Sequence, residues 1–382
     1  MKIVSISEEK RKYDRKEEIK EILDEIEESR NVLTGVDLSE NSFSPECLLA
    51  LVQLLSTIPQ LETVTFKGIF TQRVKAEVEE SLGYVVEYLS KLSGIKYFDL
   101  SDNALSLHGM KILCPLVEKM HTLQHLVLNN NGIGRDGGEY LAEALTALSK
   151  ESVALQSIEI GRNRLEDSAR KIGKALELFP YLDSVKIYQN SIPSVIIGDL
   201  LHSLMPLHLR VLDIADNFLL EHGSVVLAKC LARWNIEALN ASDCLMGDRG
   251  LEALAQGIQF RSRVQGELLP EREIDLSYNE ITSSSLRSLQ EFMQKTAMCT
   301  LILTGNEYTS EEVEHLKVIA EQIGSDLLIK EESEDEFDFS SEEESLKEKE
   351  KDFSDEIGIL GQKLAEMSLH PDEPATTSTK QP

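Results

Sequence analysis

Hydrophobic residues recur along the chain with one fixed spacing. Apolar side chains stand at positions 1, 4 and 6 of a short segment, an Asn stands at position 9, and another apolar residue stands at position 11, as in the segment 123–133. The alternation at positions 4 and 6 predicts a short strand. Between copies, apolar residues at helical spacing predict helices at 136–149, through Leu141, Leu145 and Leu148, and at 221–233.

Ten copies of this pattern can be counted. Nine carry Asn or Cys at the ninth position: Asn41, Asn103, Asn131, Asn163, Asn190, Asn217, Cys244, Asn279 and Asn306. The tenth is weaker and has Ile69 there. The interval is 27 residues at each step from Asn163 to Cys244, which is typical of leucine-rich repeats with a full helix in every unit. We therefore predict an α/β solenoid, a ribonuclease-inhibitor-like horseshoe with a parallel sheet on its concave face and helices on its convex face.

The ninth position of each repeat, called the ladder position below, has a structural cause. A buried amide donates and accepts at once, so it can pair backbone groups left free where a strand ends. In LVLNNNGIG only Asn131 is at this position, so Asn130 should face solvent and offer its amide to a partner. The alternative is a merely tolerated loop Asn. Candidate partner contacts stand at the same place in other repeats: Asp102, Arg162, Gln189 and Asp216.

The weaker copy is followed by an unusual turn. Ile69 and Phe70 replace the Asn turn, TQRVK follows, and 34 residues separate Ile69 from Asn103. We expect the longer loop to project and to present Arg73 and Lys75 at the rim. The alternative is an ordinary surface Arg paired with Glu77 or Glu79.

The two ends differ from the repeats. Residues 1–30 carry Ile19, Ile22, Leu23 and Ile26 at helical spacing and predict an N-terminal helical cap that shields the first strand. Residues 31–330 form the repeat domain, closed by a helix at 311–323 and a strand at 327–329. Residues 331–356 hold 14 acidic side chains and 3 Lys, a net charge of −11, and predict a disordered segment. Residues 357–382 are expected to form a short amphipathic helix and a disordered tail.

Composition and charge narrow the function. The formal net charge of −28 argues against nucleic-acid binding, because an acidic protein repels the polyanion, and favours a partner with a basic face. Five widely spaced cysteines indicate neither a disulfide scaffold nor a zinc site. The N-terminus becomes charged too early for a signal peptide, and no apolar run has the length of a membrane span. We expect a monomeric cytoplasmic protein without a membrane anchor.

The chain also contains no phosphate-binding loop, no dinucleotide-binding loop and no G-x-S-x-G. We therefore expect no self-contained active site, no cofactor and no metal. The remaining hypotheses from these residues are a partner-binding solenoid, a repeat adaptor or inhibitor without catalytic effect, and a chaperone of basic proteins that uses the acidic segment.

Three motifs in order, FTQRVKAE, LSDNAL and LNNNGIG, resemble the GTPase-activating proteins of the small GTPase Ran, whose pattern reads F-T-G-R-V-K, L-S-D-N-A and L-x-N-N-G-[LI]-G. The likeness runs from the N-terminal cap to about Ser325 and into the acidic segment, in the compact form of fungal members. It implies an activator of GTP hydrolysis by Ran in nucleocytoplasmic transport. The activator acts in trans and is not itself the enzyme, and GTP and Mg²⁺ belong to the partner. Ran-GTP is the implied partner, with Ran-binding protein 1 as a possible second.

The resemblance also assigns residues. Asn130 and Arg73 would be the functionally critical pair, with Lys75 alongside. In this family catalysis is described without an arginine finger, and the Asn orients the GTPase's own catalytic Gln, so Arg73 and Lys75 would be docking contacts. Because many activators insert an Arg to stabilise the transferred phosphoryl group, a finger role for Arg73 stays open. The chain departs from the family at Gln72, where Gly is frequent, and at Asn129, where His is common.

Overall fold

The structure is a computed structural model that describes residues 2–7, 9–258, 272–296 and 299–329. The acidic segment 331–356, the C-terminal residues 357–382 and Met298 of the last repeat lie outside the described residues. Residues 1–330 belong to one compact unit, and the description below concerns that unit alone.

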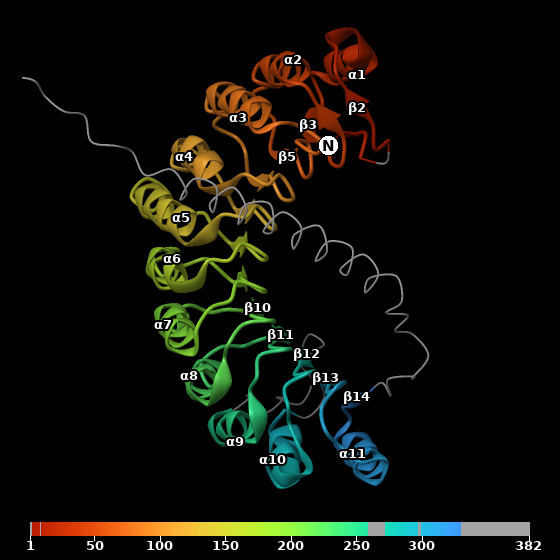
Figure 1. Ribbon diagram of the computed structural model, residues 1–382, viewed down its shortest axis with the longest axis vertical. Helices are drawn as coiled ribbons and strands as arrows, with labels where there is room; N and C mark the ends of the chain where they lie inside the picture. Colours follow the sequence, from red (N-terminus) through yellow and green to blue (C-terminus); the bar gives the residue numbers. More distant parts are fainter. Residues whose placement is uncertain (1, 8, 259–271, 297–298, 330–382) are drawn as a thin grey trace, which may run out of the picture. The chain divides into compact units, whose positions relative to one another are not determined.

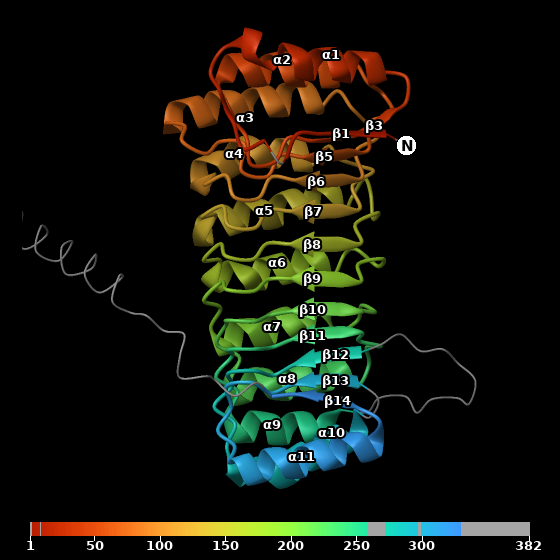
Figure 2. The ribbon, with the colours of Figure 1, turned by 90° about the vertical axis from the view of Figure 1, so that its right-hand side faces the viewer.

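Twelve of the described strands form one parallel sheet, in which the strands stand side by side in the order of the sequence. They are β1 (Lys2–Ser5), β3 (Leu33–Asp37), β5 (Thr63–Thr65), β6 (Tyr97–Asp99), β7 (His125–Val127), β8 (Ser157–Glu159), β9 (Ser184–Lys186), β10 (Val211–Asp213), β11 (Ala238–Asn240), β12 (Arg272–Asp275), β13 (Cys299–Ile302) and β14 (Asp326–Leu328). Two further strands, β2 (Lys12–Tyr13) and β4 (Ser42–Phe43), pair with each other. Figure 2 shows the stacked strands of the main sheet.

One helical segment follows nearly every strand. These are η1 (Lys16–Ile19) and α1 (Lys20–Ser29), α2 (Pro45–Leu55), α3 (Lys75–Leu89), α4 (Ser106–Val117), α5 (Gly134–Leu148), η2 (Glu166–Ser168) and α6 (Ala169–Leu176), α7 (Ser194–Leu204), α8 (Leu220–Leu231), α9 (Gly247–Gly257), η3 (Ser283–Ser285) and α10 (Leu286–Lys295), and α11 (Ser310–Ile323). The predicted helices at 136–149 and 221–233 are confirmed as α5 and α8, each beginning one or two residues earlier.

The unit curves with the sheet inside and the helices outside (Figure 1). Curvature follows from size, because packed helices need about 8–10 Å each whereas hydrogen-bonded strands need about 4.8 Å. The predicted leucine-rich-repeat solenoid, with its sheet on the concave face, is confirmed. The closing helix and strand are confirmed as α11 and β14, which pairs with β13.

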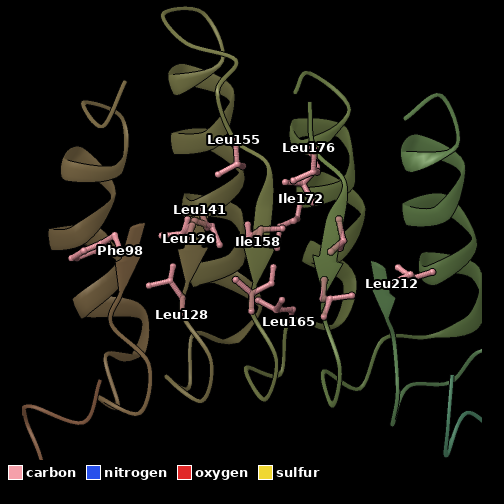
Figure 3. Packing of buried hydrophobic residues seen from close by; sticks show 14 of the residues in the cluster. Phe98, Leu126, Leu128, Leu141, Leu155, Ile158, Leu165, Ile172, Leu176 and Leu212 are labelled. Carbon is pink, nitrogen blue, oxygen red and sulfur yellow. The ribbon is translucent and has the colours of Figure 1, made fainter. Parts of the chain in front are cut away.

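The core lies between the sheet and the helices, as the periodic apolar positions predict. The middle residue of each three-residue strand from β5 to β11 is buried, and Phe98, Leu126 and Ile158 are fully buried beside helix residues such as Leu141 and Ile172 (Figure 3). Each repeat exposes an apolar face that only the next repeat covers, so the hydrophobic free energy is gained by stacking.

The N-terminal cap holds more than the predicted helix. The helix is confirmed as η1 and α1, with Ile19, Ile22 and Ile26 buried. Before it, β1 extends the sheet by pairing with β3, with Val4 opposite Val36. The cap is therefore itself a strand–helix unit, and it covers the first strand of the repeats by backbone pairing as well as by a helix.

Candidate functional site

The ladder amides join successive repeats at the carboxyl ends of the strands. Asn131 is fully buried, and its Nδ2 donates to Leu100 O at 3.0 Å and to Leu128 O at 3.1 Å. Its Oδ1 accepts the backbone N–H of Asn103 at 3.0 Å. The same arrangement recurs at Asn163, Asn190 and Asn217. The predicted structural role of the ladder is confirmed.

The residue immediately before each ladder position adopts a left-handed backbone conformation. These residues form what we call the pre-ladder row: Glu40, Gly68, Asp102, Asn130, Arg162, Gln189, Asp216, Asp243, Tyr278 and Gly305, with φ between 50° and 70°. The turn is required because the chain must bring the ladder side chain back beneath the strand end. Its consequence is a series of side chains, one per repeat, along the carboxyl edge of the sheet.

Asn130 lies in this row after β7 and is exposed, whereas the adjacent Asn131 is buried, so the predicted inside–outside assignment is confirmed. Its backbone N–H donates to Gly161 O at 2.9 Å. Its side-chain Nδ2 donates to Asp102 Oδ1 at 2.8 Å. Within the described residues, Oδ1 of Asn130 accepts no hydrogen bond. The site thus presents one exposed amide whose oxygen is available to a partner.

The other predicted row residues continue along the same edge. Arg162, Gln189 and Asp216 are exposed, and Asp102 is half-buried. The guanidinium Nε of Arg162 donates to Gln189 Oε1 at 2.5 Å, so these two side chains form a pair and point together. Whether these residues bind a partner stays a prediction.

A hollow of about 340 Å³ adjoins Asn130 on the concave face. Asp102, Asn130 and Arg162 line it, together with strand residues that include Tyr97, Asp99, Glu159 and Tyr188. Burial raises the pKa of the Asp99 carboxyl above its usual value. Burial, reinforced by the carboxylates of Asp99 and Glu159, raises the pKa of Tyr97 to about 12. Three carboxyl side chains, Asp99, Asp102 and Glu159, and two cationic ones, Lys67 and Arg162, line the hollow, so it offers charges of both signs.

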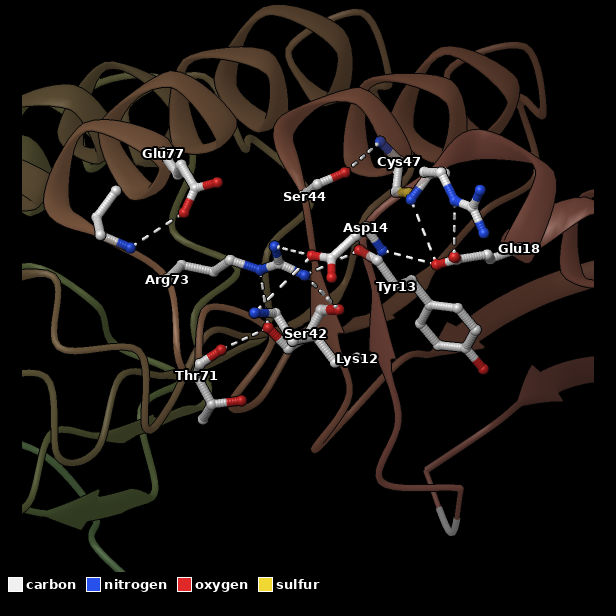
Figure 4. A network of polar contacts seen from close by, with 12 residues as sticks. Lys12, Tyr13, Asp14, Glu18, Ser42, Ser44, Cys47, Thr71, Arg73 and Glu77 are labelled. Carbon is white, nitrogen blue, oxygen red and sulfur yellow. Dashed lines mark hydrogen bonds and ion pairs between the residues drawn. The ribbon is translucent and has the colours of Figure 1, made fainter.

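Arg73 does not project from the rim, and the prediction that it does is wrong. Its side chain is only 4% exposed, because the guanidinium turns back onto the N-terminal cap (Figure 4). It pairs with Asp14 Oδ1 at 2.5 Å and donates to the backbone oxygens of Tyr13 at 2.8 Å and Ser42 at 3.1 Å. Its Nε donates to Ser42 Oγ at 2.9 Å. The pairing expected as the alternative, with Glu77 or Glu79, is also not the one observed.

The loop that carries Arg73 packs against the neighbouring repeat because it begins with two apolar residues. Ile69 and Phe70 are buried, with Ile69 at the ladder position, and the Phe70 N–H donates to Asn103 Oδ1 at 3.0 Å. The long interval between Ile69 and Asn103 contains this loop and then α3, which has 15 residues. Lys75 opens α3 with a side chain that is 68% exposed, 3.6 Å from Glu79. Lys75 and Arg73 line a second hollow, separate from the one beside Asn130.

The structure shows the surroundings of both departures from the pattern, Gln72 and Asn129. Gln72 has a φ of 60°, a conformation that favours Gly. Asn129 accepts the N–H of Gly161 through Oδ1 at 2.7 Å, and its Nδ2 lies 3.4 Å from Glu159 Oε2. Asn129 thereby fastens the base of the Asn130 turn to the next repeat.

Several residues of the site were missed by sequence reasoning. Gly161 holds both Asn129 and Asn130, and a Cβ there would lie 2.3 Å from the ring of Tyr188. Lys67 lies 3.5 Å from Asp102. All three, Lys67, Gly161 and Tyr188, stand two positions before the ladder position of their repeats. Aligning the repeats on the ladder position would have placed these three residues at one equivalent position.

The remaining candidate chemistry is sparse. All five cysteines are free and buried among apolar side chains. Within the described residues no cluster of three His, Cys, Asp or Glu is arranged to hold a metal ion. In the same part of the chain, every helix is too short or too polar to cross a bilayer.

Comparison with known proteins agrees with the repeat pattern. Residues 119–142 match the family described as Leucine Rich repeat. Ran GTPase-activating protein 1 of Saccharomyces cerevisiae is 33% identical over 264 residues, 65% of this chain and 64% of that protein. The protein of the same name from Xenopus laevis is 33% identical over 186 residues, 46% of this chain and 32% of that protein. The chain thus spans less than two thirds of the length of these relatives. Among solved structures, the tropomodulin C-terminal domain of Caenorhabditis elegans matches with a TM-score of 0.33 and 19% identity, covering 42% of this chain and 90% of that one.

Proposed function

Because this chain contains leucine-rich repeats and is related in sequence to Ran GTPase-activating proteins, we propose that it binds Ran in its GTP-bound form and accelerates hydrolysis of the bound GTP. It acts in trans, and the bond is broken in the active site of the GTPase. The nucleotide and its Mg²⁺ ion belong to the partner. We place this activity in the cytoplasm, with the protein acting as a monomer in nucleocytoplasmic transport.

The observation that carries the proposal is the exposed amide of Asn130. Phosphoryl transfer by a GTPase depends on a positioned water molecule and a Gln that orients it. An amide oxygen accepts a hydrogen bond from another amide, so Asn130 Oδ1 can hold the side-chain NH₂ of that Gln. Because the Asn130 backbone is fixed by its hydrogen bond to Gly161, the contact reduces the freedom of the Gln at little further entropic cost.

Charge supports the choice of partner. The whole chain has a net charge of −28, and three of the five charged residues that line the hollow beside Asn130 carry carboxyl groups. Such a surface steers a basic partner toward the edge where Asn130 lies. Lys75, exposed at the start of α3, is the proposed docking contact.

Arg73 takes a different part in this proposal from the one the resemblance implies. Its guanidinium is held by Tyr13, Asp14 and Ser42, so insertion into a GTPase active site would require four hydrogen bonds to break. We assign it to ordering the loop that leads into α3 and Lys75. Its replacement should raise the half-saturating concentration of activator, whereas loss of an arginine finger would lower the maximal rate.

Single-turnover release of phosphate from GTP-loaded Ran tests the function. The wild-type protein should accelerate release, and Asn130→Ala should lower the maximal rate by about a hundredfold or more, as loss of a positioned catalytic hydrogen bond does elsewhere. Absence of acceleration by the wild type refutes the proposal. Binding of Ran-GTP without acceleration would instead identify an adaptor or inhibitor. Repeating the assay over a range of activator concentrations with Ran-binding protein 1 added shows whether that protein increases the rate of phosphate release.

A further inference from the structure

Four side chains from four successive repeats are linked along the carboxyl edge of the sheet. Lys67 Nζ lies 3.8 Å from Glu40 Oε1 and 3.5 Å from Asp102 Oδ2. Asp102 Oδ1 in turn accepts the Nδ2 hydrogen of Asn130 at 2.8 Å. Glu40, Asp102 and Asn130 belong to the pre-ladder row, but the row member of the second repeat is Gly68, which has no side chain. Lys67 fills that gap from the neighbouring position.

This linkage settles which way the Asn130 amide faces. The terminal torsion of an Asn side chain has two orientations of similar energy when nothing distinguishes its oxygen from its nitrogen. An ionised carboxylate only accepts hydrogen bonds, so the atom that faces Asp102 must be Nδ2. Oδ1 is then turned away from Asp102. An acceptor beside Asn130 therefore determines which group the amide offers to a partner.

Asp102 is itself well placed to act as a fixed acceptor. Its φ is 60°, and its backbone N–H donates to Asn129 O at 2.9 Å, so its Cα is tied to the repeat that carries Asn130. Lys67 stands on its other side, with Nζ 3.5 Å from Oδ2. The carboxylate therefore has a cation on one side and the Asn130 amide on the other.

We propose that Asp102 is a positioning residue for the activation of the GTPase: it holds the Asn130 amide with Oδ1 outward, toward the Gln of the partner. This inference rests on the proposed function, because it assigns Asp102 a part in the step that Asn130 performs. Asp102 does not touch the reacting atoms. Its effect is entirely on the fraction of Asn130 side chains in the competent orientation.

Kinetics of phosphate release separates this role from direct docking. In Asp102→Ala the amide loses its preferred orientation, about half of the side chains stay competent, and we expect the maximal rate to fall by about twofold at a nearly unchanged half-saturating concentration. Asp102→Asn has a single acceptor oxygen, which Lys67 attracts, so its NH₂ faces Asn130 and favours the reversed amide; its maximal rate should fall at least as far. The matched control is Asp243→Ala, which removes an exposed carboxylate at the same place in a distant repeat and should leave the rate unchanged. A raised half-saturating concentration at an unchanged maximal rate would make Asp102 a docking contact and overturn the proposal.

A double mutant gives the sharpest test. If Asp102 acts only through Asn130, Asp102→Ala should have no further effect on the maximal rate in an Asn130→Ala background. An equal loss in both backgrounds would overturn the proposal. Nuclear magnetic resonance of the Asn130 side-chain NH₂ in the free protein supplies a readout independent of Ran. We expect its two proton shifts to move in Asp102→Ala and to stay in Asp243→Ala. Unmoved shifts refute the positioning contact, whereas moved shifts with no activation by the wild type refute the proposed function alone.

Discussion

Replacing Asn131 by Ala removes an amide that makes three hydrogen bonds to backbone groups. The three backbone groups are not affected equally, because two of them keep another donor. Leu100 O keeps the Nδ2 of Asn103 at 3.0 Å, and Leu128 O keeps the Nδ2 of Asn163 at 2.9 Å. The backbone N–H of Asn103 has Asn131 Oδ1 as its acceptor and is left without it.

These contacts set the expected cost. One buried N–H without an acceptor costs about 1–3 kcal/mol, and each carbonyl that loses one of two donors adds about 0.5 kcal/mol, so Asn131→Ala should lower the free energy of unfolding by about 2–4 kcal/mol. Asn130→Ala loses an exposed hydrogen bond and the tolerance of Asn for its left-handed turn, about 1–2 kcal/mol. Asn130→Gly, which tolerates that turn, is the matched control.

Urea unfolding of the three variants measures the difference. Hydrogen exchange adds a local readout, because the Asn103 N–H should exchange faster in Asn131→Ala and at the wild-type rate in Asn130→Gly. Equal losses of stability in Asn130→Ala and Asn131→Ala would contradict the inside–outside assignment. An unchanged exchange rate at Asn103 would show that the ladder does not hold that N–H.

Three further outcomes follow from the site. Arg73→Ala should lower the free energy of unfolding by about 2–3 kcal/mol, since it removes the hydrogen bonds of a charged and buried donor. It should also speed hydrogen exchange of the backbone amides in residues 12–15. A free energy of unfolding equal to that of the wild type would show that the cap does not depend on Arg73. Gln72→Val should cost about 1–2 kcal/mol because a branched residue resists positive φ, while Gln72→Gly should cost nothing measurable by thermal unfolding. Burial raises the pKa of Asp99 in the folded protein, so the stability associated with this group is present below the ordinary Asp pKa and is lost as pH rises through the raised value. Asp99→Asn, which keeps an acceptor for the Ser101 N–H, should therefore be more stable than wild type at pH 7 and lose that advantage near pH 3 in pH-dependent unfolding.

Features that depend on the repeat period could be predicted from the sequence. Position within the repeat determines burial, so the solenoid, the strand phase and the opposite exposures of Asn130 and Asn131 all follow from counting residues. The strand β1 was missed because Val4 and Ile6 form a single short alternation without a ladder Asn after it. One incomplete copy does not establish a period.

Arg73 shows why the rest could not be predicted. Its partners Tyr13 and Asp14 lie 60 and 59 residues away in sequence, in the cap and not in the repeats. No periodic rule relates those positions, and an Arg after a long loop has the same pattern whether it faces solvent or a neighbouring strand. The contact between Lys67 and Asp102 was missed for a related reason, because it depends on a Gly in the row whose missing side chain leaves room for a neighbour.

The left-handed turn before every ladder residue has a consequence for how such a protein changes over evolution. The stack is held by the buried amides one position later, so each row side chain can be exchanged with little effect on folding. Natural variation in the row already spans Glu, Gly, Asp, Asn, Arg, Gln and Tyr on one backbone geometry. A binding edge can therefore be rewritten one repeat at a time, and partner specificity can diverge while the scaffold is inherited unchanged.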